Sequence, residues 1–227
     1  MSQKAILLIH GMGQFSEPVD DVPGSFGQDF RKASTEALQR YPQYSDDVLE
    51  SHVDLHEFNY DRWFTQIRNI MADRARSMRD KVQAVSGLYD LKFSGDLVGR
   101  LVNLEERFGG DEFFYTHWLD TIFYASMLGA KVRADAAVKI AALVQSYGPG
   151  NVHIVAHSLG TAVLHDTLHL LYRAESDPND TIPDLHLTNH KLASIWMIAN
   201  VSRLVNGVSR FSDPLNSVVR PGAEGCT

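Results

Sequence analysis

Four short apolar runs, separated by longer amphipathic segments, dominate the pattern along the chain. These runs are Ala5 to Ile9, Val48 to Phe58, Val152 to Ala156 and Leu192 to Ala199. Ala5 to Ile9 is apolar throughout, which is typical of a strand buried on both faces of a parallel sheet, whereas Val48 to Phe58 alternates apolar and polar residues. Apolar residues at helical spacing between Phe26 and Ala37, and again from Leu159 to Tyr172, predict connecting helices. Strands that alternate with helices indicate an α/β fold, a mostly parallel sheet flanked by helices.

Residues 61–147 have a different pattern, in which apolar stripes recur at helical spacing. We expect a largely helical insertion or cap between the second strand and the third, within one domain spanning residues 1–227. The basic run from Arg74 to Lys81 is typical of a solvated helix face, or alternatively of a surface for an anionic head group or acidic partner. The aromatic cluster from Phe113 to Trp118 fits core packing, or the lining of an acyl pocket.

The composition of the chain argues against several classes of function. The chain has 227 residues with 44% hydrophobic and 22% charged, ordinary globular usage. Its formal charge of −7 argues against nucleic acid as a partner, because phosphate contacts need a basic surface. There is no apolar run of about 18 residues to span a membrane and no secretory signal, and Cys226 is the only cysteine. We therefore expect a cytoplasmic protein with no transmembrane segment; its oligomeric state is left open.

The most informative motif lies where the third apolar run ends, in Ala156-His157-Ser158-Leu159-Gly160. A strand leads into a serine, and small residues then open a helix. A nucleophile elbow requires this order, because the serine sits on a sharp turn and its neighbours two residues away must be small. The plain alternative is a strand–turn–helix in which Ser158 is only the helix N-cap.

With these residues the sequence resembles the α/β-hydrolase superfamily, in particular its lipase-like serine esterases. Ala156 replaces the first glycine of the family's Gly-x-Ser-x-Gly pattern, a difference of one methyl group. The resemblance implies that Ser158 is the nucleophile and that it forms an acyl-enzyme with an ester.

A second motif, His10-Gly11-Met12-Gly13, follows the first apolar run. By itself it is a glycine turn. In the family that the chain resembles, such a turn supplies one backbone N–H of the oxyanion hole. The resemblance therefore implies donors from Met12 and Leu159, with His10 in a structural role.

No residue is evident as the catalytic base. His165 and His169 lie on a helix that leads away from Ser158, and the side chain of His157 should diverge from its neighbour. His186 and His190 enter the fourth strand from the opposite edge. Asp213 is a candidate acid, although a turn aspartate before proline is the simpler interpretation. The resemblance implies further strands and a catalytic histidine after them, so we expect a C-terminally incomplete hydrolase, inactive or nearly so by itself.

The sequence thus predicts a serine hydrolase for a small-molecule or lipid ester, without a cofactor or metal. A zinc site on His165 and His169 is disfavoured because the elbow already explains that helix. Two alternatives stay open: a non-catalytic α/β-hydrolase fold that binds a ligand or protein, and an acyltransferase.

Overall fold

The structure is a computed structural model. It describes residues 4–12, 26–44, 49–89, 100, 102–103, 120–172, 183–186, 188–202 and 204–205, with backbone alone for 82–89. Gly13, Asp213 and the aromatic cluster from Phe113 to Trp118 lie outside the described residues.

Four parallel strands form a single sheet in the order β2-β1-β3-β4. Their bounds are Lys4–Ile9 (β1), Val53–Phe58 (β2), Val152–His157 (β3) and Ser194–Ile198 (β4). The predicted α/β fold with a parallel sheet is thereby confirmed. β2 begins later than the sequence pattern suggests, because Leu49–Ser51 (η2) forms a 3-10 turn instead of extended backbone.

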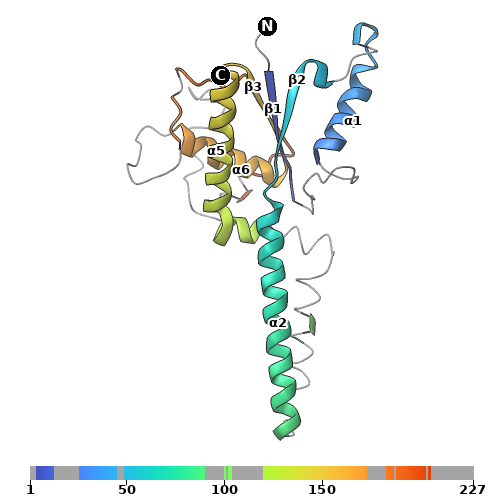
Figure 1. Cartoon of the computed structure of the whole chain (residues 1–227), viewed down its shortest axis with the longest axis vertical. Coiled ribbons are helices and arrows are strands. Elements are labelled where there is room, and N and C mark those ends of the chain that lie inside the picture. Colours follow the sequence, from blue (N-terminus) through green and yellow to red (C-terminus); the bar gives the residue numbers. More distant parts are fainter. Residues whose placement is uncertain are drawn as a thin grey trace.

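Helices cover both faces of this sheet (Figure 1). The described helices are α1 (Phe26–Leu38), η1 (Pro42–Tyr44), α2 (Asp61–Tyr89), the π-helix η3 (Tyr124–Leu128), α5 (Gly129–Tyr147) and α6 (Leu159–Leu171). α5 packs against α6, and both contact β1 and β3 from one side, whereas α1 contacts β2 from the other. Right-handed crossovers require this arrangement, because the chain moves from β1 to β2 in one direction and from β3 to β4 in the opposite one.

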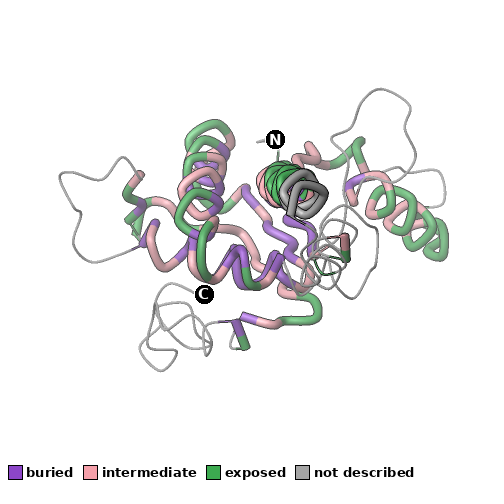
Figure 2. The backbone as a smooth tube through the Cα atoms, turned by 90° about the horizontal axis from the view of Figure 1, so that it is seen from below, coloured by how far each residue is buried: buried purple, intermediate pink, exposed green. Residues whose placement is uncertain are grey.

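The core lies between the sheet and the α5–α6 layer, as the buried segments in Figure 2 show. In β1, Leu7 and Ile9 on one face and Leu8 on the other are completely buried, which explains why this strand is apolar without alternation. α2 instead extends away from the sheet (Figure 1), and its described side chains are buried mainly near its start. In the part of the chain that the structure describes, no helix combines the length and hydropathy needed to cross a membrane.

Candidate active site

The candidate site lies at the carboxyl ends of β1 and β3. Ile9 pairs with Ala156, so the turn that begins at His10 and the turn that holds Ser158 leave the sheet side by side. From this point the chain continues to α1 on one face and to α6 on the other. Such a topological switch point is where open α/β sheets bind their ligands.

Ser158 occupies a strained turn between β3 and α6. Its backbone angles, φ 50° and ψ −122°, lie in a region that non-glycine residues rarely adopt, at a cost of about 1–3 kcal/mol. Its N–H donates to the Ile198 carbonyl (3.0 Å), and its carbonyl accepts from the Thr161 N–H (2.9 Å). Although Ser158 stands at the N-cap position of α6, its side chain makes no capping hydrogen bond. Ser158 is partly exposed, and its hydroxyl is not used to cap the helix.

Two glycines allow the turns after β1 and β3 to touch. A Cβ atom on Gly160 would lie 2.3 Å from the His10 carbonyl oxygen and 2.6 Å from that of Ile9. A Cβ atom on Gly11 would lie 2.9 Å from Cβ of Ser158. No larger residue fits at either position without a shift, so the glycines that the motifs contain are required by this close approach.

The two backbone N–H groups expected to form an oxyanion hole belong to residues next to this contact. Leu159 is the first residue of α6, so its N–H has no carbonyl acceptor within the helix. Met12 directly follows Gly11, and its sulfur accepts a hydrogen bond from the Thr121 hydroxyl at 3.1 Å. The amino end of a 13-residue helix adds a partial positive charge at Ser158.

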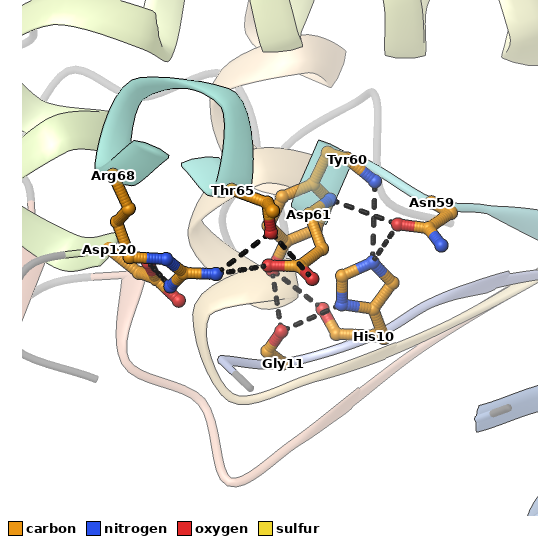
Figure 3. Close-up of polar contacts among 8 residues, drawn as sticks. All are labelled: His10, Gly11, Asn59, Tyr60, Asp61, Thr65, Arg68 and Asp120. Atoms are coloured by element: carbon orange, nitrogen blue, oxygen red, sulfur yellow. Dashed lines mark hydrogen bonds and ion pairs between the residues drawn. The ribbon is translucent and has the colours of Figure 1, made fainter. Parts of the chain in front are cut away.

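We call the turn after β1, which holds His10, Gly11 and Met12, the first turn. The side chain of His10 is completely buried in it and lies next to Tyr60 and Asn59 (Figure 3). Its Nδ1 lies 2.7 Å from the Gly11 carbonyl oxygen, and its Nε2 accepts from the Tyr60 N–H at 3.3 Å and lies 3.2 Å from Oδ1 of Asn59. Burial lowers the pKa of His10 to about 4, because it penalises the charged imidazolium. The ring is therefore neutral at pH 7. The neutral imidazole carries one proton, and we assign it to Nδ1 because Nε2 accepts from the Tyr60 N–H and the Gly11 oxygen can only accept; Nε2 then has no proton to donate to Asn59.

A buried ion cluster lies next to His10 at the start of α2 (Figure 3). The Arg68 guanidinium bonds Asp120 at 2.7 Å and Asp61 at 3.3 Å, and all three side chains are almost fully buried. Thr65 joins the cluster by donating to Asp61 and accepting from Arg68. The cluster ties α2 to the segment that leads into η3, directly below the first turn.

Sequence reasoning did not single out this cluster or Tyr60. A usable signal was present: Asn59, Tyr60 and Asp61 follow a buried strand directly, and parallel strands end at one edge of the sheet. Arg68 also lies four residues from both Phe64 and Ala72, on the apolar face of its helix.

The segment after β4 is connected to the turn at Ser158 through hydrogen bonds of Thr161. The buried Thr161 hydroxyl donates to the Ser158 carbonyl at 2.6 Å and accepts from the Val201 N–H at 3.0 Å. Ala199, which follows β4, has a left-handed backbone with φ 50°. The carboxyl ends of β3 and β4 are thus joined through Thr161.

Among the described histidines, His157 lies on the same side of the sheet edge as Ser158, whereas His190 does not. A Cβ atom on Gly11 would lie 2.9 Å from Nδ1 of His157 as well as from Cβ of Ser158, so both neighbours reach the first turn instead of simply diverging. No hydrogen bond links the side chains of His157 and Ser158 in the described part of the chain.

His190 lies at the amino end of β3, because the carbonyl of the next residue, Lys191, accepts from the Gly150 N–H there. It is therefore at the opposite edge of the sheet from Ser158.

The His165–His169 pair lies on α6, packed into the protein. His165 is buried and its Nδ1 lies 3.2 Å from the Asp166 carboxylate, which also accepts from the Tyr124 hydroxyl at 2.8 Å. Among the residues described, no group of three or more metal-binding side chains comes together.

Comparison with protein-family models, with curated proteins and with solved structures gives no match for this chain. The interpretation of the site therefore depends on the geometry described above.

Loss of the buried cation should destabilise the protein strongly. In Arg68→Met the apolar side chain keeps most of the volume but removes the guanidinium that neutralises the buried Asp61 and Asp120 carboxylates. We expect the free energy of unfolding in urea at pH 7 to fall by about 3–5 kcal/mol. The matched control is Arg76→Met, whose partner Asp73 is exposed, and it should cost less than about 1 kcal/mol. Equal losses in the two variants would contradict the structural role of the cluster.

His10 should make stability pH-dependent. Its folded-state pKa of about 4 lies below the unfolded value of 6.5, so the unfolded state takes up the proton first as pH falls. The contribution of neutral His10 to the free energy of unfolding is therefore complete above pH 6.5 and is lost progressively as the pH falls towards 4. Between pH 7 and pH 5 the wild type should lose about 2 kcal/mol more unfolding free energy than His10→Asn does. An identical pH dependence in both proteins, measured by urea unfolding, would show that His10 does not titrate this way.

Proposed function

We propose that the protein is a serine hydrolase of carboxylic esters that works through an acyl-enzyme on Ser158. The observation that carries this proposal is the state of Ser158: partly exposed, in a strained turn, not capping its helix, and in contact with Gly11. A serine that is kept in costly backbone geometry and whose hydroxyl does not cap its helix is typical of a nucleophile.

In the proposed reaction, Oγ of Ser158 attacks the ester carbonyl carbon and the carbonyl oxygen becomes an oxyanion. The N–H groups of Met12 and Leu159 stabilise that charge, by about 3–4 kcal/mol for each donor. The alcohol then leaves, and water hydrolyses the acyl-enzyme to the acid and the free serine. A histidine, which the resemblance implies without assigning it to a position in this sequence, takes the serine proton and returns it to the departing alkoxide, and Asp213 is the candidate for the acid that orients it.

The surroundings of Met12 favour an apolar acyl group. The Thr121 hydroxyl bonds the Met12 sulfur, so the segment from Asp120 to η3 lies beside the first turn. Ile122 and Met127 on this segment are about half exposed (51% and 56%). Exposed apolar side chains of this kind suit the acyl chain of a small-molecule or lipid ester better than a charged substrate.

A second candidate is a non-catalytic fold that binds a ligand at the same edge of the sheet. Within the described ranges no imidazole makes a hydrogen bond to the Ser158 hydroxyl, and this observation favours binding without turnover. Acyl transfer shares the first half of the hydrolase reaction, and the two differ in whether water or another acceptor takes the acyl group.

The nucleophile assignment is tested with a fluorophosphonate probe and an ester substrate. The probe should label the complete protein and its exposed-serine control Ser77→Ala, but not Ser158→Ala, whose ester turnover should fall by more than about 10³-fold. Mass analysis of the products separates the free acid from a transferred acyl group. Continued labelling of Ser158→Ala would place the nucleophile at another serine. A complete, folded protein that is neither labelled nor active would support the binding candidate.

A further inference from the structure

We propose that the Tyr60 hydroxyl is a positioning group that, together with His10, fixes the direction of the Met12 N–H. The importance of that direction for a reaction depends on the proposed function, whereas the positioning itself is a property of the fold. Tyr60 stands between β2 and α2, far from Met12 in sequence, and Figure 3 shows it next to His10 and Gly11.

The contacts converge on two consecutive carbonyl groups. The Tyr60 hydroxyl shares its proton between two acceptors in a three-centre hydrogen bond, the His10 carbonyl oxygen at 2.8 Å and the Gly11 carbonyl oxygen at 3.0 Å. The Gly11 oxygen also accepts from Nδ1 of His10 at 2.7 Å. Two side chains that are at least 99% buried therefore hold one carbonyl oxygen, which fixes its position far more tightly than solvent would.

Peptide geometry transmits this constraint to Met12. The Gly11 carbonyl and the Met12 N–H belong to the same planar unit, and the peptide bonds of the described residues are all trans. In a trans peptide the C=O and N–H bonds point in opposite directions. Because Tyr60 and His10 hold the oxygen at the buried side, the N–H is directed away from them. Gly11 itself lies against Cβ of Ser158.

The surroundings of Tyr60 make it a reliable donor. Burial and the nearby Asp120 carboxylate raise the pKa of its hydroxyl well above the ordinary value, so it stays protonated. Its ring stacks on the imidazole of His10 with centroids 4.2 Å apart, and it meets the ring of Phe64 edge-on at 5.5 Å. The ring is thereby fixed independently of the hydroxyl, so removal of the oxygen alone should leave the packing in place.

The test compares Tyr60→Phe with a matched tyrosine. Tyr172 also donates its hydroxyl to a backbone carbonyl, that of His190 at 2.6 Å, but at the opposite edge of the sheet. Tyr172→Phe therefore removes the same kind of bond without reaching Met12. A third variant carries p-aminophenylalanine at position 60, which restores a donor on the same ring.

The direct measurement is the residual dipolar coupling of the Met12 N–H in the full 227-residue chain, labelled with [¹⁵N]methionine and assigned with Met12→Leu. Tyr60→Phe should change this coupling and lower the order parameter of the N–H to about 0.6 or below. Couplings of the other methionines should stay the same and report an intact fold. Tyr172→Phe should leave Met12 unchanged, and p-aminophenylalanine should restore it.

Kinetics provide the second readout. In Tyr60→Phe, kcat for an ester should fall about 10-fold while KM stays within about twofold, because the N–H acts on the oxyanion and not on the bound ester. An unchanged Met12 coupling in Tyr60→Phe would overturn the inference. Should that variant fail to fold, an altered Met12 coupling in the p-aminophenylalanine variant would overturn it instead. A wild type without ester turnover would count against the proposed function alone, since the coupling still decides the role of Tyr60.

Discussion

The pairing of β1 with β3 is the constraint on which the site depends. It places the turn after Ile9 against the elbow after His157, and the contact is possible only because Gly11 and Gly160 have no side chains. Larger residues at these positions would push the two turns apart. The same contact brings Ser158 close to Gly11, the residue before Met12, so the site proposed at Ser158 depends on the strand order.

A polar layer beneath the first turn keeps that contact in one arrangement. His10 and Tyr60 bond the carbonyls of the turn, and Arg68 joins the start of α2 to Asp120. Buried charges and imidazoles are costly unless they are paired, and here His10 is hydrogen-bonded and Arg68 is paired with two carboxylates. The strained backbone at Ser158 follows the same principle, since packing must overcome its cost.

The strands, the α/β class and the helix after Ser158 could be predicted from sequence because each depends on local patterns: unbroken apolar runs and helical spacing. The nearness of the turn after Ile9 to Ser158 could be predicted only from the family resemblance, because residues so far apart in the sequence meet only through the strand order. Tyr60 and Arg68 were missed because their roles depend on tertiary burial. A tyrosine after a strand and an arginine among apolar residues have no distinct signature until the fold places them under a turn.

The most direct test of this account is a crystal structure of the protein after reaction with a phosphonate ester. We expect phosphorus bonded to Oγ of Ser158, with its anionic oxygen about 3 Å from the backbone nitrogens of both Met12 and Leu159. An adduct on Ser158 whose anionic oxygen faces solvent, away from those two nitrogens, would contradict the account, as would an adduct on a different residue.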